Sequence, residues 1–490
     1  MKLDQFFKSK GYGIEDKLTM EPYIDEFKEW YKGNIPSFQN YTIYNGDTQI
    51  HCKRRTLNMA KKVCEDFANL LLNEKVTYNI GNEETEDKVY PIWKENNFDT
   101  LANEGVEKAF ALGTGAFVLS LGELEYNPET EQINTEMAKV KIDFATADKI
   151  YPLSYTRNKI TECAFASRRV INNKPMLYVS IHRKATDQDE ITTGNYMVEN
   201  YLFKINRGGN LVDVTDSLTD IIRVIDTGDI VPWFSILKPN ITNNIDMDNP
   251  MGVSVFGNSI DVLKGLDIAY DSLINEFILG RKRIFVEDDL LQPDATTGQF
   301  KKIFDTNDVV FHSLPGSNTG DNAGKKITES DMELRIEEHE KGIQQNLNIL
   351  SSKVGFGQKY YDFNQGSVQT ATQIVSENSD LFRNIKKHEI LIEECLRDLF
   401  KGIFSMMSNF LSINIPIDTE VSINFDDSII EDTAETKRQA QLEYNLGLID
   451  KVMYFMMTRK LDEEQAKQLV EEIEGRMPTE PEPTQEGNEE

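Results

Sequence analysis

The chain has 490 residues, of which 82 are acidic and 53 basic, so its formal net charge at pH 7 is -29. This excess argues against a protein that grips nucleic acid over a broad face, because such binding relies on cations that neutralise phosphates. It is compatible with a surface past which a polyanion slides. The length predicts about two to four structural units.

The four cysteines are scattered and form no CxxC pair, which favours buried thiols in a reducing compartment over disulfides or a metal site. They are Cys52, Cys64, Cys163 and Cys395. No stretch near Met1 suits a signal peptide, and no run reaches the roughly 18 apolar residues of a membrane span. We therefore expect a soluble intracellular product that does not enter a membrane.

The first half of the chain is predicted to be a mixed helix and strand region. Apolar spacing predicts helices over 20–33, 57–73 and 100–112. Between residues 115 and 235, alternating or β-branched runs separated by Asn, Asp and Gly predict strands. Their expected ranges are 117–120, 140–144, 163–170, 176–182, 194–204 and 222–226.

Three long amphipathic helices are predicted in the middle of the chain. The first covers 255–279 and carries Asp267 on its otherwise apolar stripe, and Gly280 supplies its end. The second opens at Ser330 with a capping box to Glu333 and reaches residue 350. The third starts near Thr370 and keeps its stripe for about ten turns, or roughly 50–55 Å. A helix of that length needs an equally long partner, which neighbouring copies of the chain would supply.

The C-terminal part is predicted to hold one strand, further helices and a tail. Residues 419–425 read as a single strand, most easily placed as an edge that returns to the first unit. Helices are expected over 433–445 and 463–474. The last residues are rich in proline and glutamate, a composition that does not form a core.

Motifs typical of enzymes are weak in this sequence. The run from Gly320 to Lys326 has neither the spacing nor the Ser or Thr of a phosphate-binding loop. The run from Asp246 resembles the start of a calcium loop, but Gly257 stands where the bidentate Glu is needed. No histidine pair has ligand spacing, and no nucleophile elbow appears. We therefore predict no enzyme, no catalytic residue, no metal and no cofactor.

Two segments remain as candidate sites. Arg281, Lys282 and Arg283 follow the first long helix, where they either compensate its dipole or form a docking surface. The second segment, from residue 353 to 366, combines glycines, aromatics and two lysines. Either its aromatics pack into a core, or it is a loop that contacts DNA. The DNA-facing candidates are Lys353, Lys359, Tyr360 and Tyr361.

Several strings together resemble a known family. The strings KPNITNN at 238–244, PMGVSVFGNSID at 250–261, NEF to GRKRIF between 275 and 285, and TATQIVSENS at 370–379 carry the resemblance. Weaker echoes at 57–63 and 148–152 extend it over most of residues 20–475. The chain resembles the portal proteins of long-tailed double-stranded DNA bacteriophages of the SPP1-like type.

The resemblance implies an α+β portal fold assembled into a ring, usually of twelve copies, at one capsid vertex. It assigns 1–250 to a mixed wing, with a return strand in 409–430. The two stem helices would be 251–280 and 330–352, flanking a small clip at 281–329. Then follow a tunnel loop (353–369), a long kinked helix (370–408) and crown helices (431–475). Residues 476–490 lie beyond the pattern as an acidic tail.

The implied function is a conduit for double-stranded DNA entering the prohead and later leaving it. By analogy, the terminase large subunit docks on the clip and a head-completion or adaptor protein later replaces it. Scaffold protein and major capsid protein would be further partners. The protein would be made in the host bacterial cytoplasm and would reside in the virion, and a negative ring would keep DNA mobile in its channel.

Two other interpretations stay open at this point. One is a coiled-coil structural or scaffolding head protein without a DNA channel, against which the strand-rich insert between paired helices argues. The other is a nucleotide-driven enzyme, which the absent phosphate loop disfavours.

Overall fold

The structure is a computed structural model, and the chain divides into two compact units. The first unit comprises 1–368 and 383–425, and the second 369–382 and 426–490. The structure describes every residue except 45, 74–75, 124, 128–131, 135–137, 172, 190, 207, 216–220, 281–282, 288–310, 315–326, 331–332, 363–370, 426–432, 460–465, 468, 471–472 and 474–490. Helices and strands are both abundant, so the predicted α+β class is confirmed.

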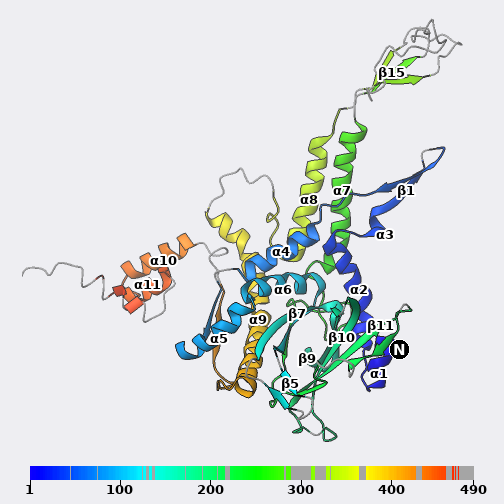
Figure 1. The fold of residues 1–490 in the computed structure, drawn as a ribbon. Helices are drawn as coiled ribbons and strands as arrows, with labels where there is room; N and C mark the ends of the chain where they lie inside the picture. Colours follow the sequence, from blue (N-terminus) through cyan, green and yellow to red (C-terminus); the bar gives the residue numbers. More distant parts are fainter. Residues whose placement is uncertain are drawn as a thin grey trace, which may run out of the picture. The chain divides into compact units, whose positions relative to one another are not determined.

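A six-stranded antiparallel sheet forms the largest β structure of the first unit (Figure 1). Its strand order is β12-β11-β10-β9-β8, and β13 pairs with β11 beside this path. The strands are β8 (Ile150–Thr156), β9 (Lys159–Ile171), β10 (Lys174–Lys184), β11 (Tyr196–Ile205), β12 (Leu211–Asp213) and β13 (Val224–Asp226). Strands β9 and β10 extend beyond the predicted ranges 163–170 and 176–182, because hydrogen bonding in the ladder continues past the apolar residues into polar ends. Strands β11 and β13 begin two residues later than predicted.

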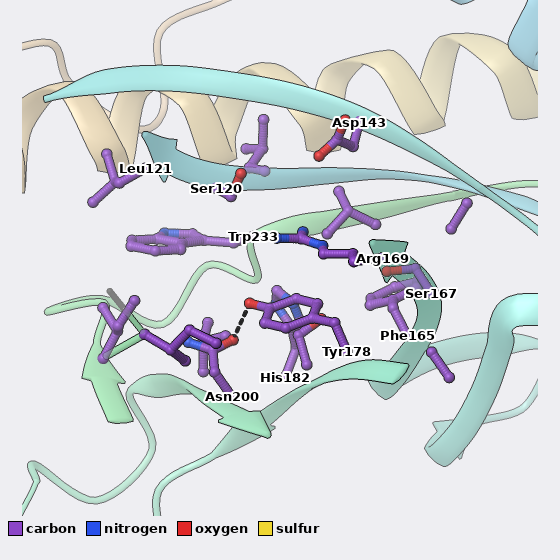
Figure 2. A pocket seen from close by; sticks show the side chains of 18 of the residues that line it. Ser120, Leu121, Asp143, Phe165, Ser167, Arg169, Tyr178, His182, Asn200 and Trp233 are labelled. Atoms are coloured by element: carbon purple, nitrogen blue, oxygen red, sulfur yellow. Dashed lines mark hydrogen bonds between the residues drawn. The ribbon is translucent and has the colours of Figure 1, made fainter. Parts of the chain in front are cut away.

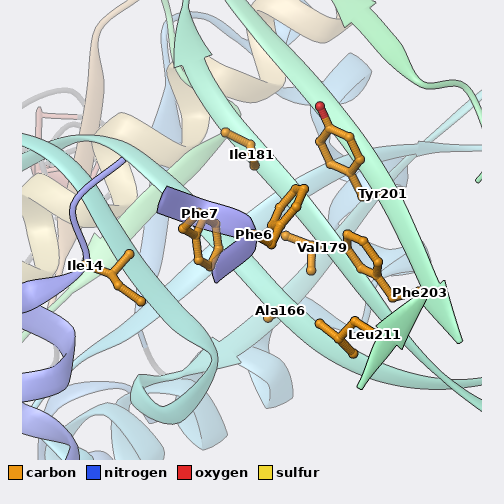
Figure 3. Close-up of a cluster of buried hydrophobic side chains, with 10 residues drawn as sticks. Phe6, Phe7, Ile14, Ala166, Val179, Ile181, Tyr201, Phe203 and Leu211 are labelled. Carbon is orange, nitrogen blue, oxygen red and sulfur yellow. The ribbon is translucent and has the colours of Figure 1, made fainter. Parts of the chain in front are cut away.

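The short N-terminal helix α1 (Leu3–Ser9) covers part of this sheet with two aromatic rings (Figure 3). Phe6 lies 4.9 Å from Phe203 between ring centroids, and Phe7 is fully buried. Val179 and Ile181 of β10 lie in the same cluster. The sequence analysis did not predict this helix, because two phenylalanines within seven residues give too short a periodic pattern.

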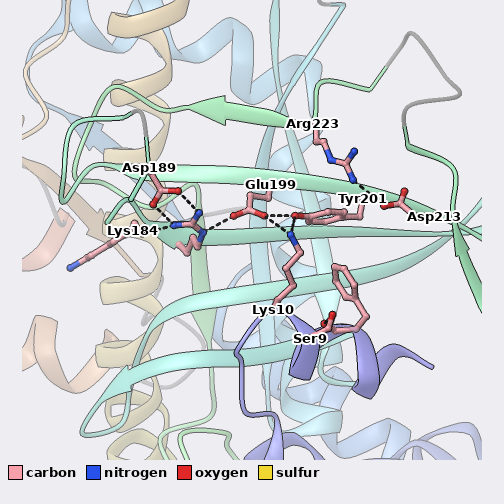
Figure 4. Close-up of polar contacts among 10 residues, drawn as sticks. Ser9, Lys10, Lys184, Asp189, Glu199, Tyr201, Asp213 and Arg223 are labelled. Atoms are coloured by element: carbon pink, nitrogen blue, oxygen red, sulfur yellow. Dashed lines mark hydrogen bonds and ion pairs between the residues drawn. The ribbon is translucent and has the colours of Figure 1, made fainter. Parts of the chain in front are cut away.

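A partly exposed ion network fastens the same helix end to β10 and β11 (Figure 4). Arg183 binds Asp189 through two nitrogens at 2.7 and 2.8 Å and Glu199 at 2.6 Å. Lys10 donates to the Tyr201 hydroxyl at 2.6 Å, and that hydroxyl donates to Glu199. The bonds from Arg183 hold the pKa of Asp189 well below its usual value.

A second, three-stranded sheet lies beneath a helical layer. Its order is β14-β4-β7, from β4 (Gly115–Gly122), β7 (Lys139–Thr146) and β14 (Phe234–Leu237). Helices α4 (Met59–Leu71) and α6 (Phe98–Leu112) supply buried rings, of which Phe67 and Phe110 lie 5.4 Å apart. Both predicted helices are confirmed to within two residues at each end.

The long helix α9 (Ala371–Phe410) contributes to this core from residue 383 onward. Its buried residues there include Ile385, Ile392, Leu399 and Ile403, which all belong to the predicted stripe. His388 lies on the same stripe, 5.2 Å from the ring of Phe67. Its Nδ1 accepts a hydrogen bond from the backbone N–H of Asn240 at 3.0 Å, so this histidine has a packing role.

The remaining small elements connect these layers. They are α2 (Glu15–Lys32), α3 (Pro36–Gln39), α5 (Glu83–Glu95), β1 (Asn40–Tyr44), β2 (Gln49–Lys53), β3 (Thr77–Ile80), β5 (Glu125–Asn127), β6 (Gln132–Asn134), β18 (Val421–Asn424) and the 3-10 turns η1 (Ala147–Lys149) and η3 (Gly257–Ser259). Strand β18 pairs antiparallel with β3, so the predicted return of the late strand to the first unit is confirmed.

In the second unit, α10 (Thr433–Asn445) and α11 (Lys451–Arg459) form a small helical pair. The Tyr454 hydroxyl donates to Gln441 Oε1 at 2.7 Å, and the Tyr444 and Tyr454 rings lie 5.2 Å apart. Helix α10 has the bounds that were predicted for it, 433–445. Most of the helix predicted over 463–474 and the whole tail 476–490 lie outside the described residues.

Candidate functional site

Helices α7 (Ile260–Leu279) and α8 (Ile336–Val354) form the helix pair that the sequence analysis predicted (Figure 1). Leu263 and Leu266 of α7, and Leu347 and Leu350 of α8, are buried. Asp267 is the charged residue on the otherwise apolar stripe of α7. Its carboxylate accepts a hydrogen bond from the backbone N–H of Leu57 at 2.8 Å, which explains how a charge is accommodated at this position. The charged residue on this face therefore anchors the segment before α4.

An ion pair joins the two helices where they meet the inserted segment. Arg335 binds both carboxylate oxygens of Glu276, through Nε at 3.1 Å and Nη2 at 3.0 Å. His339 Nε2 lies 3.6 Å from the same carboxylate. The bonds from Arg335 lower the pKa of Glu276 to about 2, so this carboxylate stays charged at any pH near neutrality.

The start of the second helix differs from the prediction. Ser330 does not cap a helix, because it ends strand β17 (Ile327–Ser330) and pairs there with Arg283. Helix α8 begins at Ile336, and its N-cap residue Arg335 makes no side-chain capping bond. Similarly, α7 begins at Ile260 rather than Val255, after the 3-10 turn η3. The capping-box assignment at Ser330 was wrong.

Strands β15 (Arg283–Glu287), β16 (Phe311–Leu314) and β17 form a small sheet between the two helices in the sequence. β15 pairs parallel with β16 and antiparallel with β17. Of the three basic docking candidates, Arg283 is the first residue of β15. Arg281 and Lys282 lie outside the described residues. Compensation of the helix dipole and a docking surface therefore both stay predictions for these three residues.

The segment after α8 is a glycine turn packed onto α4. Gly355 (φ 87°) ends the helix in the left-handed region, where a Cβ would lie 2.5 Å from Asn384 Nδ2. Phe356 is 2% exposed and lies 4.4 Å from Phe67 and 4.6 Å from Tyr360, between ring centroids. This turn is therefore held by aromatic packing.

The two tyrosines of the predicted DNA-facing loop lie in this packed turn. Both are half-buried, and burial raises the pKa of each hydroxyl. The Tyr361 hydroxyl donates to Asp66 Oδ2 at 2.8 Å, and Lys62 binds the other oxygen of Asp66 at 2.5 Å. For these aromatics the structure shows the packed arrangement that composition left open, and contact with DNA stays a prediction.

The two lysines are differently placed from the tyrosines. Lys353 lies in the last turn of α8 rather than in the loop, and its Nζ donates to the Asn258 carbonyl at 2.5 Å. Lys359 lies in the turn, with an exposed side chain. The later part of the predicted tunnel loop, 363–369, lies outside the described residues.

A cavity of about 900 Å³ lies between the two sheets (Figure 2). Arg169 stacks 4.0 Å from the Tyr178 ring, and the Tyr178 hydroxyl donates to Asn200 Oδ1 at 2.6 Å. Two buried lining atoms, His182 Nδ1 and Trp233 Nε1, have no hydrogen-bond partner among the described residues.

Burial lowers the pKa of His182 to about 3, so its ring is neutral near pH 7. No hydrogen bond joins this ring to a serine or carboxylate among the described lining residues. Over the described residues, no group of three His, Cys, Asp or Glu side chains is placed to hold a metal ion. Nor does any described helix have the length and apolar character needed to span a bilayer.

The comparison with protein families decides the identity. Residues 13–479 match the profile described as "Phage portal protein, SPP1 Gp6-like". This chain belongs to that phage portal family. The portal fold predicted from the sequence strings is thereby confirmed. No curated protein matches the chain.

Solved structures of similar fold come from gene transfer agent particles. A chain from the "Virion of native gene transfer agent (GTA) particle" is 10% identical, with a TM-score of 0.39, covering 91% of this chain and 99% of that one. A chain from the "Neck of empty GTA particle computed with C6 symmetry" is 10% identical, with a TM-score of 0.40, covering 81% and 88%. One from the "Neck of native GTA particle computed with C12 symmetry" is 11% identical, with a TM-score of 0.37 and the same coverage.

Sequence reasoning missed the residues that hold the turn after α8. Asp66 and Phe67 of α4 supply the hydroxyl acceptor and the aromatic surface for a segment almost 300 positions later in the chain. The one available signal was Asp66 within an apolar helix, since a carboxylate at a buried position needs a donor. Nothing in the sequence pointed to Tyr361 as that donor.

Proposed function

We propose that this portal chain assembles into a closed ring, of twelve copies by family analogy, whose channel conducts double-stranded DNA into the prohead and later out of it. Membership of the phage portal family carries this proposal. The α7–α8 pair supports it, because Phe277, Ile278 and Leu334 near its far end are each 37–45% exposed in the single subunit. Apolar side chains at such positions gain burial when copies pack side by side.

The charge of the chain suits a conduit. Each copy carries a formal charge of -29, which a ring multiplies. A negative channel repels the phosphate backbone and so limits adsorption of DNA to its wall. Exposed lysines such as Lys359 would make local contacts with passing phosphates. The neighbouring tyrosines would hold the turn against α4, where Tyr361 bonds Asp66.

The segment 281–329 would be the docking platform for the terminase large subunit, and afterwards for a head-completion or adaptor protein. The small sheet β15–β17 supports this role, because it forms a separate module inserted between the two helices. Arg281, Lys282 and Arg283 would provide its basic contacts. Scaffold protein and major capsid protein would hold the ring at its capsid vertex in the virion.

The mass of the purified full-length chain, measured by light scattering together with negative-stain imaging, tests the proposal. We expect a single large species that appears as a ring with a central hole. A solid or filamentous assembly would favour a scaffolding head protein without a channel. A chain that stays a single folded subunit at high concentration and joins no particle would overturn the portal ring.

A further inference from the structure

The β1–β2 hairpin presents an uncovered apolar face. Its register places Tyr41 opposite Cys52 and Ile43 opposite Ile50, so these four side chains share one face. Ile43 is 48% and Ile50 45% exposed, whereas Tyr41 and Cys52 are half-buried. The opposite face carries polar side chains such as Thr42, His51 and Gln49, together with Tyr44, which is 66% exposed. One side of the ribbon is thus suited to burial and the other to solvent.

This hairpin lacks a third strand. Neither β1 nor β2 pairs with another strand among the described residues. A two-stranded ribbon alone is marginally stable in water, and open apolar edges invite association. The hairpin therefore needs a cover that the single subunit does not provide.

The base of the hairpin is nevertheless firmly fixed to α7. The Arg55 guanidinium and backbone N–H both bind Asp271 Oδ1, at 2.8 and 3.2 Å. Arg54 donates to the Phe38 carbonyl at 2.5 Å and stacks 4.9 Å from the Tyr41 ring. The ribbon thus leaves the helix pair from a defined point and direction. Its five-residue strands give it a reach of about 17 Å, which exceeds the roughly 8–10 Å between packed helices.

The same subunit offers a different surface that matches this face. Phe277 and Ile278 of α7 and Leu334 before α8 are exposed. Next to them the first turns of α8 carry exposed acids, Glu337, Glu338 and Glu340, which border the apolar side chains. Two unlike, complementary patches on one chain are what a head-to-tail ring interface requires.

We propose that the β1–β2 hairpin is an intersubunit arm, whose face of Tyr41, Ile43, Ile50 and Cys52 covers the apolar end of the α7–α8 pair in an adjacent copy. This inference rests on the proposed ring. It assigns the hairpin to a second copy of the chain rather than to another head protein, because the receiving patch lies on the chain itself.

Cys52 provides a native reporter for the arm. The other three cysteines are buried, at 2% exposure or less, and Cys52 alone is accessible in the single subunit. Maleimide labelling of assembled rings should therefore be slow at Cys52, and fast in subunits carrying Ile43→Asp with Ile50→Asp. We expect that double variant to lose the ring peak in size-exclusion chromatography while its circular dichroism and thermal unfolding stay unchanged.

Matched controls separate the arm from general surface effects. Ile230→Asp and Met247→Asp alter residues that are 69% and 81% exposed elsewhere, and they should leave the ring intact. Oxidation with copper phenanthroline should join native Cys52 to Phe277→Cys of the adjacent copy by a disulfide and give a ladder of covalent oligomers, which Cys52→Ser should abolish.

Rings that tolerate both aspartates, with Cys52 reacting freely, would overturn the arm and leave the portal ring standing. Protection of Cys52 only in complete particles would also overturn it, because the occupant would then be another head protein. A wild-type chain that forms no ring would overturn the proposed function itself. That outcome is seen in the mass of the wild-type protein and does not depend on the labelling of Cys52.

Discussion

The hydroxyl of Tyr361 donates a hydrogen bond to Oδ2 of Asp66 at 2.8 Å, across 295 positions of the sequence. Because Lys62 binds the other oxygen, the carboxylate of Asp66 joins a cation on its own helix to the turn that follows α8. The side chain of Asp66 is 9% exposed. Loss of either donor would leave a buried charge short of a partner.

Replacement of Tyr361 by phenylalanine tests this link. We expect Tyr361→Phe to lower the free energy of unfolding by about 1–2 kcal/mol, because the ring still packs but the carboxylate loses a donor. Thermal unfolding, together with the rate of proteolysis in the turn, measures the effect. Tyr360→Phe is the matched control, since no described residue bonds the Tyr360 hydroxyl. Equal effects of the two variants would contradict the assigned role of Asp66.

Two glycines at the end and in the middle of α8 should respond in opposite directions to alanine. Gly355 has a φ of 87° and faces Asn384 closely, so Gly355→Ala should cost about 1–2 kcal/mol or more. Gly342 lies inside the helix with open space around it, so Gly342→Ala should stabilise by up to about 1 kcal/mol. Unfolding temperatures of the two variants, compared with the wild type, provide the measurement. A stabilising Gly355→Ala would contradict the left-handed helix end.

His388 should make the protein sensitive to acid. Burial lowers its pKa from 6.5 to about 3, so the unfolded chain takes up a proton between these values and the folded chain does not. Stability should therefore fall as pH drops below about 6.5, and level off near pH 3 for this group. Protonation would also remove the acceptor for Asn240 N–H.

His388→Gln keeps an acceptor and removes the titration. We expect it to be less stable than the wild type near neutral pH, with the difference shrinking by on the order of 2 kcal/mol by about pH 4.5. The other titrating groups cancel in this comparison of unfolding temperatures. A difference that stays constant with pH would show that His388 has the same pKa in the folded and the unfolded protein.

Lys359 tests the DNA-facing part of the proposed channel. Lys359→Ala should leave ring assembly intact and alter packaging or retention of DNA, because it removes a cation from an exposed position. Particle yield and packaged DNA length measure the outcome, with Lys2→Ala, at another exposed lysine, as control. Loss of rings would instead assign the residue a structural role.

Much of the helical architecture could be predicted from apolar spacing alone. Helices α4, α6, α7 and α9 lie within a few residues of the predicted ranges, because their apolar residues recur at helical spacing. The late strand β18 and its return to the first unit also followed from the pattern. Helix α5 was missed because Pro91 and its acidic first turn give a weak apolar pattern.

The candidate site was harder to predict, because its contacts join distant segments. Ser330 and Glu333 have the spacing of a capping box, yet Ser330 pairs with Arg283 in the small sheet and the helix begins only at Ile336. The aromatics of the turn were recognised, but composition does not distinguish a ring packed on Phe67 from one facing a channel. The exposed face of the β1–β2 hairpin was likewise not predicted from the sequence, since its short strands carry few apolar residues.

The seating of α1 on its sheet has a practical consequence for handling the protein. The amino group of Met1 lies 3.5 Å from the Leu211 carbonyl, and Phe6 and Phe7 fill the surface beneath. Removal of this segment would expose the apolar surface of the sheet and promote aggregation during purification. An affinity tag fused directly to Met1 would occupy the same space as this contact. A tag separated from Met1 by a spacer, or inserted at an internal surface site, is therefore the better choice for immobilising the protein.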